Sequence, residues 1–189
     1  MKILITGGSG FIGTNLIGDL RETNEIVNYD KVSSATFPEL SIVGDIRNRE
    51  QLFQALRGVD AIVHLAAEHA DDVSPVNLYY EVNVEGARNL VDAAEANNVN
   101  TLIFTSSVAL YGLNVGIPTE ESLIQPFNDY GKSKHQAELI FRNWCEVDQA
   151  RSLVIVRPSV IFGENNRGNV YNLLNQLFNG RFILVGNGS

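Results

Sequence analysis

Tyr130 and Lys134 stand four residues apart within the stretch 130–134, which reads Tyr-Gly-Lys-Ser-Lys. On a helix, residues four apart project from the same face, so a phenol and an ammonium would lie side by side. A free phenol has a pKa of about 10 and is a poor base at neutral pH, but a neighbouring positive charge favours the phenolate. The pair therefore predicts a tyrosine that takes and returns a hydroxyl proton. An exposed helix can carry the same spacing without any chemistry.

The first thirteen residues hold a second chemical signal, an apolar run followed by glycines at Gly7, Gly8, Gly10 and Gly13. Glycines allow a sharp turn and let a pyrophosphate approach the free N–H groups of a helix N-terminus. The apolar residues that follow recur at helical spacing, so the order is strand, turn and helix, as a dinucleotide fingerprint requires. A plain loop can carry the same glycines, but this context favours a dinucleotide site.

Asp30 closes the next apolar run, 25–29. It lies about 20 residues beyond Gly7, near the distance at which an acid accepts hydrogen bonds from the adenosine ribose. A carboxylate there would repel the 2′-phosphate of NADP, so NAD is the expected cofactor. Lys31 keeps NADP as the less favoured alternative, and a surface aspartate that starts a turn is the plain structural one.

The composition is that of an ordinary globular chain, with 189 residues, 44% hydrophobic and 19% charged, and a formal net charge of −8. This length allows a core that folds unaided. The negative charge argues against a nucleic-acid partner, because phosphate backbones recruit Lys and Arg. The single cysteine, Cys145, excludes an intramolecular disulfide, and His69 and His135 have no partners at ligand spacing, so we expect no metal. Without a signal peptide or a membrane-length apolar run, we expect a cytoplasmic protein with no membrane partner.

The periodicity predicts strands that alternate with helices. Apolar runs predict strands at 2–6, 25–29, 41–43, 61–67 with its exit, 101–105, 153–157 and 182–185. Helical spacing predicts helices over 11–20, 49–56, 76–97, 129–148 and 171–178, with Asn48 as an N-cap. This alternation predicts an α/β fold, a doubly wound parallel sheet of the Rossmann type with helices on both faces. Ligands bind such sheets at the carboxyl ends of the strands, where the candidate residues lie.

Further motifs follow in order along the chain, and together with the glycine stretch they carry a resemblance. They are Gly44-Asp45-Ile46-Arg47, His64-Leu65-Ala66-Ala67, Asn83-Val84-Glu85-Gly86, Thr105-Ser106-Ser107, Tyr111-Gly112, residues 130–134, and Arg157-Pro158 with Gly163 after it. With these motifs the chain resembles, over essentially its whole length, the extended short-chain dehydrogenase/reductases. These include the NAD-dependent epimerase/dehydratases that act on nucleotide sugars.

The resemblance implies a role for each candidate residue. Ser107 would hydrogen-bond the reacting sugar hydroxyl, Tyr130 would be the acid/base, and Lys134 would bind the nicotinamide ribose and hold Tyr130 ionised. Tyr130 and Lys134 would thus also contact the cofactor. The other cofactor-binding residues would be Gly7, Gly10, Phe11, Ile12, Gly13, Asp30, Lys31, Asp45, Ile46, Leu65, Ala66, Ala67, Thr105, Ser106 and Pro158.

One departure from the family pattern bears on the reaction. The 4,6-dehydratases carry Thr-Asp-Glu where this chain has Ser107-Val108-Ala109, so the acid pair that eliminates water is absent. This favours an NAD-dependent nucleotide-sugar epimerase similar to the UDP-glucose 4-epimerases, which transfers hydride reversibly at a sugar carbinol carbon. Two alternatives stay open: a reductase or dehydrogenase of the same family that acts on another small carbinol, and a non-catalytic cofactor-binding protein.

Family members add a smaller C-terminal substrate domain, and this chain stops as that domain would begin. We therefore expect an NAD-binding Rossmann domain over 1–160 and the start of an incomplete substrate-binding region over 161–189. Helices 76–97 and 129–148 carry more apolar residues than one sheet face needs, and family members pair through this region. A homodimer through these helices is expected, although an intramolecular fit explains the same residues.

Overall fold

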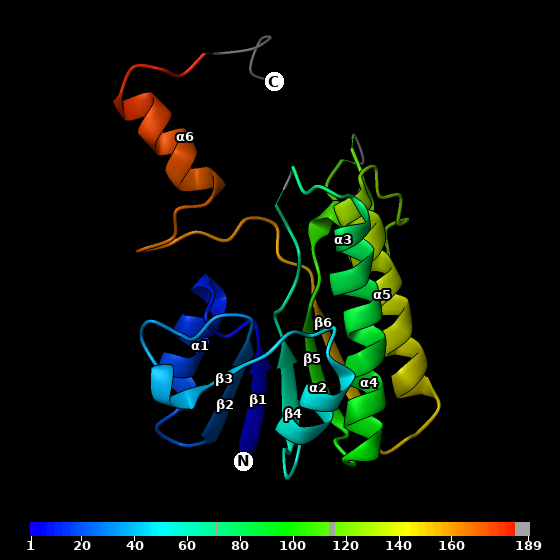
Figure 1. Ribbon diagram of the computed structural model, residues 1–189. Helices are drawn as coiled ribbons and strands as arrows, with labels where there is room; N and C mark the ends of the chain where they lie inside the picture. The colour runs from blue at the N-terminus through cyan, green and yellow to red at the C-terminus, as the bar shows by residue number, and fades with distance from the viewer. Residues whose placement is uncertain (71, 114–115, 184–189) are drawn as a thin grey trace. The chain divides into compact units, whose positions relative to one another are not determined.

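A computed structural model describes residues 1–70, 72–113 and 116–183. The chain separates into two compact units, of which the first, Met1–Ser159, holds a sheet with helices on both faces (Figure 1). The second unit begins at Val160, and its described helix, α6 (Asn169–Phe178), has no buried residue. The candidate residues all lie in the first unit.

Six strands of the described chain form one sheet in the order β3-β2-β1-β4-β5-β6, and every neighbouring pair is parallel. Their bounds are β1 (Lys2–Thr6), β2 (Glu25–Asp30), β3 (Ser41–Val43), β4 (Ala61–His64), β5 (Thr101–Thr105) and β6 (Ser152–Val156). The order reverses between β1 and β4, which makes this the switch point where doubly wound sheets bind ligands. The predicted α/β, doubly wound sheet of the Rossmann type is confirmed.

Helices cover the two faces of the sheet unequally (Figure 1). One face carries α1 (Phe11–Leu20), and the other carries α2 (Arg49–Ala55), α4 (Gly86–Ala96) and α5 (Asp129–Glu146). The short elements are η1 (Pro38–Leu40), α3 (Asn77–Tyr80), the π turn η2 (Glu81–Glu85) and η3 (Val108–Tyr111). Among the described residues, no helix is both long and apolar enough to cross a membrane.

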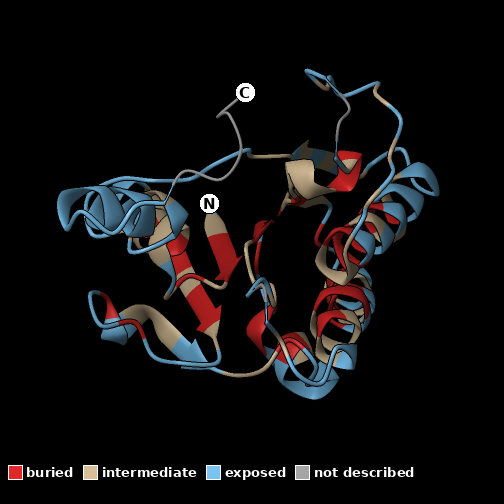
Figure 2. Cartoon of the chain, turned by 90° about the horizontal axis from the view of Figure 1, so that it is seen from above, coloured by how far each residue is buried: buried red, intermediate tan, exposed pale blue. Residues whose placement is uncertain are grey.

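Alternate strand residues enter two separate cores, because successive side chains of a strand point to opposite faces. Leu4 and Ile62 belong to the larger core, which α2, α4 and α5 cover, whereas Ile5 and Val63 belong to the smaller core beside α1. Figure 2 shows the buried residues on the strands and on the sides of the helices that face them. Burial on both faces is why β1 and β4 are continuous apolar runs in the sequence.

Asn48 caps α2 as predicted, because its side chain accepts a hydrogen bond from the Gln51 N–H at 3.1 Å. The single helix predicted over 76–97 is instead a succession of α3, η2 and α4, in which the π turn interrupts the regular ladder. The strand predicted over 182–185 is wrong at Phe182 and Ile183, which lie in no regular element. No described strand pairs with them, and an apolar run without a partner cannot form a ladder. Residues 184–185 lie outside the described residues.

Candidate functional site

The candidate residues gather along one edge of the sheet, because the carboxyl ends of parallel strands meet there. The set comprises Gly7–Gly13 after β1, Asp30 and Lys31 at the end of β2, Asp45 and Ile46 after β3, Leu65–Ala67 after β4, Thr105–Ser107 at the end of β5, and Pro158 after β6. Helix α5 adds Tyr130 and Lys134 from its first two turns.

The glycines after β1 differ in how much room their neighbours leave for a side chain. Gly7 has a φ of +73°, and a Cβ there would lie 2.6 Å from the Ala66 nitrogen. A Cβ on Gly13 would lie 2.3 Å from the Cα of Gly8, so the chain's own packing excludes any side chain. At Gly10 the nearest atom to a Cβ would be the Gly7 oxygen at 3.4 Å. At Gly10 the protein itself thus makes only one near contact, which leaves room for a bound group to approach the backbone.

Helix α1 begins without a side-chain cap. Gly10 is its N-cap residue, and no side chain accepts a hydrogen bond from the first turn, which also lacks an acidic residue. The N–H groups of Phe11, Ile12 and Gly13 are thus available to an anion, and the positive end of the helix dipole favours one. This arrangement fits the pyrophosphate of a dinucleotide.

Asp30 joins the glycine loop to the end of β2. Its Oδ2 accepts from the Ser9 N–H at 3.0 Å and its Oδ1 from the Val32 N–H at 3.2 Å, while Ser9 Oγ donates to the Val32 oxygen at 2.8 Å. The carboxylate is therefore held at the edge of the glycine loop, where a ribose would lie. Lys31 is exposed and forms no ion pair within the described chain.

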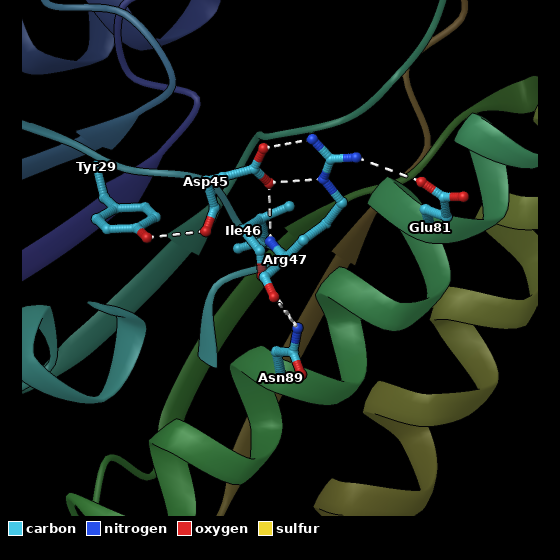
Figure 3. Close-up of polar contacts among 6 residues, drawn as sticks. All are labelled: Tyr29, Asp45, Ile46, Arg47, Glu81 and Asn89. Atoms are coloured by element: carbon cyan, nitrogen blue, oxygen red, sulfur yellow. Dashed lines mark hydrogen bonds and ion pairs between the residues drawn. The ribbon is translucent and has the colours of Figure 1, made fainter. Parts of the chain in front are cut away.

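The Asp45 carboxylate is already held by a side chain of its own loop (Figure 3). Arg47 donates from Nε to Oδ1 at 3.0 Å and from Nη2 to Oδ2 at 2.7 Å, and these bonds hold the pKa of Asp45 below its usual range. Arg47 Nη1 also lies 3.3 Å from Glu81 Oε2. Tyr29 donates to the Asp45 main-chain oxygen at 2.9 Å, and burial, with Asp45 adding to it, raises the pKa of Tyr29 to about 12.

Ile46 directs its side chain into the core. It is buried beside α4, where a Cβ on Gly86 would lie 2.8 Å from Ile46 Cγ2. Asn89 donates from Nδ2 to the main-chain oxygens of Ile46 and Arg47 at 3.3 and 3.1 Å (Figure 3). Only the main chain of Ile46 can therefore serve a cofactor. Sequence reasoning gave no role to Arg47, although an acid and a guanidinium two residues apart in a loop are a readable signal.

The structure brings Ser107 and Tyr130 together. Ser107 is the N-cap residue of η3, and its Oγ accepts from the Ala109 N–H at 3.1 Å. Burial raises the pKa of the Tyr130 phenol, and an interaction with the Ser107 hydroxyl opposes that rise. A hydroxyl next to a half-buried phenol is the arrangement that general acid–base work on a substrate hydroxyl needs.

Lys134 is 2% exposed, and its Nζ lies 4.3 Å from the ring centroid of Phe104. Within the described chain, Nζ makes no hydrogen bond to Tyr130. Burial lowers the pKa of Lys134 to about 7, and the Glu138 carboxylate opposes this shift. His64 stacks on the same Phe104 ring, and burial, helped by the Lys134 charge, lowers the pKa of His64 to about 3. His64 is thus a neutral packing residue.

Asn83, to which sequence reasoning gave no role, connects the exit of β4 to the turn that carries Tyr130. Its Oδ1 accepts from the Glu68 N–H at 2.8 Å, and its Nδ2 donates to Ser133 Oγ at 2.9 Å. Ser133 Oγ in turn donates to the main-chain oxygen of Tyr130 at 2.8 Å. The readable signal is a polar residue at a buried position of a helix. The loop through Leu65, whose carbonyl carbon lies against Gly7, is thereby fixed.

The exits of β5 and β6 are joined by main-chain bonds. The Ser106 N–H donates to the Val156 oxygen at 2.7 Å, and the Val108 N–H donates to the Pro158 oxygen at 3.2 Å. These bonds place Pro158 beside η3, the turn that Ser107 caps. Thr105, the residue before Ser106, is the last residue of β5.

A doubly wound sheet with an uncapped helix at its switch point, and a Ser-Tyr pair near a buried lysine, defines a dinucleotide-binding protein of the short-chain dehydrogenase/reductase type. Among the described residues, no group of three or more His, Cys, Asp or Glu side chains is placed to hold a metal ion. The sequence matches the NAD dependent epimerase/dehydratase family over residues 3–189, and the chain belongs to that family.

Two curated relatives and one solved structure make the similarity specific. The N-acetyl-alpha-D-glucosaminyl-diphospho-ditrans,octacis-undecaprenol 4-epimerase of Escherichia coli O157:H7 is 53% identical over 189 residues, covering 100% of this chain and 57% of the relative. The UDP-glucose 4-epimerase of Vibrio cholerae is 33% identical over 183 residues, covering 92% of this chain and 56% of the relative.

The crystal structure of UDP-glucose 4-epimerase from Brucella ovis in complex with NAD has a TM-score of 0.75 to this chain at 30% identity. The match covers 82% of this chain and 51% of that structure. This chain thus spans a little more than half the length of the curated relatives it matches.

Proposed function

We propose that this chain is the cofactor-binding and catalytic half of an NAD-dependent sugar 4-epimerase. One observation carries the proposal: Ser107, Tyr130 and the buried Lys134 lie along the sheet edge where the first turn of α1 offers its free N–H groups. The names of the relatives support epimerisation at carbon 4. The region 161–189 would begin the substrate-binding part of the protein.

The residues present fit NAD. The N–H groups after Gly10 would hold the pyrophosphate, Asp30 would accept from the adenosine ribose, and Lys134 would contact the nicotinamide ribose. The Asp30 carboxylate, already fixed by Ser9 and Val32, would repel a 2′-phosphate, so NADP would bind more weakly. Bound NAD would supply a reversible hydride acceptor at the sugar carbon.

The protein's own side chains would accept and return the proton of the sugar hydroxyl. Tyr130 would take the proton of the sugar hydroxyl while Ser107 hydrogen-bonds the same oxygen. Because burial raises the pKa of Tyr130, its phenolate needs a positive neighbour, and the Lys134 ammonium is the candidate. Tyr130 would return the proton when the keto sugar is reduced on its opposite face, which inverts the configuration.

The substrate we favour is an N-acetylglucosamine linked through a diphosphate to a polyprenol, because the 53% identical relative is named for that compound. A UDP-linked sugar is the second candidate, supported by the 33% identical relative. The polyprenol substrate would bring the protein to a lipid surface, whereas the sequence analysis expected no membrane partner.

Calorimetry of NAD and NADP, followed by turnover assays, tests the proposal. We expect wild-type protein to prefer NAD and to interconvert the 4-epimers of the polyprenol-linked sugar faster than those of the UDP-sugar. Tyr130→Phe should lower turnover about 10²- to 10⁴-fold and should change NAD affinity far less, because the groups that would hold the pyrophosphate and the adenosine ribose remain. Undetectable turnover in the wild type, with NAD binding that Tyr130→Phe weakens, would favour the non-catalytic cofactor-binding protein instead.

A further inference from the structure

A buried ion pair adjoins the candidate catalytic residues and takes no part in the chemistry described above. Arg157 donates from Nη2 to Glu138 Oε2 at 2.6 Å and from Nε to Oε1 at 2.8 Å. The side chains are 8% and 1% exposed. Such a bidentate contact fixes the orientation of the guanidinium and the carboxylate as well as the distance between them. Glu138 stands one helical turn after Lys134 on α5, so the two side chains share a face of that helix.

The same guanidinium reaches a third segment of the chain. Arg157 Nη1 donates to the Tyr111 hydroxyl at 2.7 Å and to the main-chain oxygen of Glu120 at 3.3 Å. Tyr111 is the last residue of η3, the turn that Ser107 caps. Arg157 itself precedes Pro158 directly. The pair therefore joins α5, which carries Lys134, to η3, which follows Ser107, and to the exit of β6 at Pro158.

The stability of the fold does not by itself require the buried charges of Glu138 and Arg157. Two charges lose their hydration on burial, and a well-packed apolar pair of similar volume is often as stable. What the charged pair adds is a fixed geometry among three segments, and its carboxylate belongs to a residue one turn from Lys134 on α5. The other titratable groups around Lys134 are Tyr130 on its own helix and the neutral His64 from β4.

We propose that Glu138 and Arg157 are positioning residues of the catalytic centre: their ion pair holds the segments of Ser107 and Lys134 in register. The inference rests on the proposed function for its catalytic meaning. One consequence of the inference, a change in the pKa of Lys134 when Glu138 is replaced, can be measured without turnover.

The chain has four lysines, Lys2, Lys31, Lys132 and Lys134, so their side-chain ε-carbon signals can be followed individually by NMR after carbon-13 labelling. Lys134→Arg identifies the signal of Lys134. We expect Lys134 to titrate near pH 7 in the wild type. Its midpoint should fall by about one pH unit in Glu138→Gln, because an opposing charge is lost. An unchanged midpoint in Glu138→Gln would overturn the proposal.

Glu95→Gln is the matched control, because it breaks the ion pair that Glu95 forms with Arg151 at 3.0 Å, away from the candidate site. It should leave the Lys134 midpoint unchanged. A second variant, Glu138→Leu with Arg157→Leu, removes both charges while filling their space, and it guards against simple misfolding of Glu138→Gln. We expect a wild-type melting temperature, a lowered Lys134 midpoint and at least tenfold weaker NAD binding.

A double leucine variant with the wild-type midpoint and the wild-type NAD affinity would show that the pair only fills space, and would overturn the proposal. If the wild-type chain itself bound no NAD, the proposed function would fail on its own. The Lys134 midpoint would still support or contradict the role of the pair, so the two failures are distinguishable.

Discussion

Two ion pairs of similar chemistry hold the two halves of the candidate site, and they differ in their surroundings. In the half formed by β1, β2 and β3, Arg47 and Asp45 meet at 2.7 Å with side chains 44% and 39% exposed. In the half formed by β4, β5, β6 and α5, Arg157 and Glu138 meet at 2.6 Å with side chains 8% and 1% exposed. Water screens the first pair and not the second, so similar distances carry different free energies.

The comparison extends to how each half would hold its ligand. The first half offers main-chain N–H groups and glycines, with few polar side chains. The second half offers Ser107, Tyr130 and Lys134, supported by buried polar side chains such as Asn83. A site made of main chain tolerates changes at its exposed side chains. A site made of buried charges depends on each partner.

The largest effect is expected from Arg157→Met, which leaves the Glu138 carboxylate buried without its partner. We expect a loss of about 3–5 kcal/mol in the free energy of unfolding at neutral pH, measured by urea denaturation. Arg157 holds the pKa of Glu138 below its usual range, so the stability it contributes is present above the ordinary pKa and lost as the pH falls through the lowered one. The loss in Arg157→Met should therefore shrink in acid. A loss below 1 kcal/mol would erase the contrast between the two pairs.

Gly13→Ala tests the main-chain half, because its Cβ would lie 2.3 Å from the Cα of Gly8. We expect destabilisation of about 3 kcal/mol, from overpacking that neither backbone can relieve. Gly10→Ala is the matched control, because its nearest contact would be 3.4 Å. It should cost about 1 kcal/mol as a poorer N-cap and should weaken NAD binding at least tenfold. Equal stability losses in the two variants would contradict the packing described here.

Lys134→Met should stabilise the fold, at the expense of function. The pKa of Lys134 is lowered from 10.5 to about 7, so the unfolded chain binds a proton that the folded chain releases between these values. The folded state is therefore most stable above pH 10.5 and loses stability as the pH falls towards 7, because only the unfolded chain gains the proton. We expect Lys134→Met to gain about 4 kcal/mol at pH 7 and close to nothing at pH 10.5. Parallel stability curves for the two proteins would show that Lys134 is not desolvated.

Arg47→Gln should have the smallest effect. Its ion pairs with Asp45 and Glu81 are both solvent-exposed, and we expect a change below about 1 kcal/mol in stability. The pKa of Asp45 should rise towards its ordinary value, because Arg47 is the largest cause of its lowering. NMR titration of the Asp45 carboxyl carbon checks this. A stability loss as large as that of Arg157→Met would mean that exposure does not distinguish the pairs.

The main-chain half was predictable because its signals are local. The glycine spacing, the apolar runs around it and Asp30 lie within thirty consecutive residues, and the N-cap Asn48 is recognised from its own turn. Each depends on residues that are neighbours in both sequence and space. The doubly wound, parallel class of the sheet then follows from the alternation of strands and helices.

The buried half was predictable only in part. Tyr130 and Lys134 were recognised from their spacing on one helix, but the pairing of Glu138 with Arg157 depends on the packing of α5 against β6. The helical spacing of Lys134, Glu138 and Phe141 marks a buried face, although it names no partner for an acid placed there. The π turn that contains Asn83 was also missed, because the apolar spacing of a long helix hides one inserted residue.

The strand order has a consequence for assembly during synthesis. β1 is made first and is central, β2 adds to one side of it and β3 adds to β2. β4 then adds to the other side of β1, in a register that places Thr6 opposite His64, and β5 and β6 follow outwards. Each new strand therefore meets an edge that already exists, and no strand has to insert between two that are paired. A ribosome can build this sheet in reading order, with the residues of the main-chain half in place before Tyr130 is made.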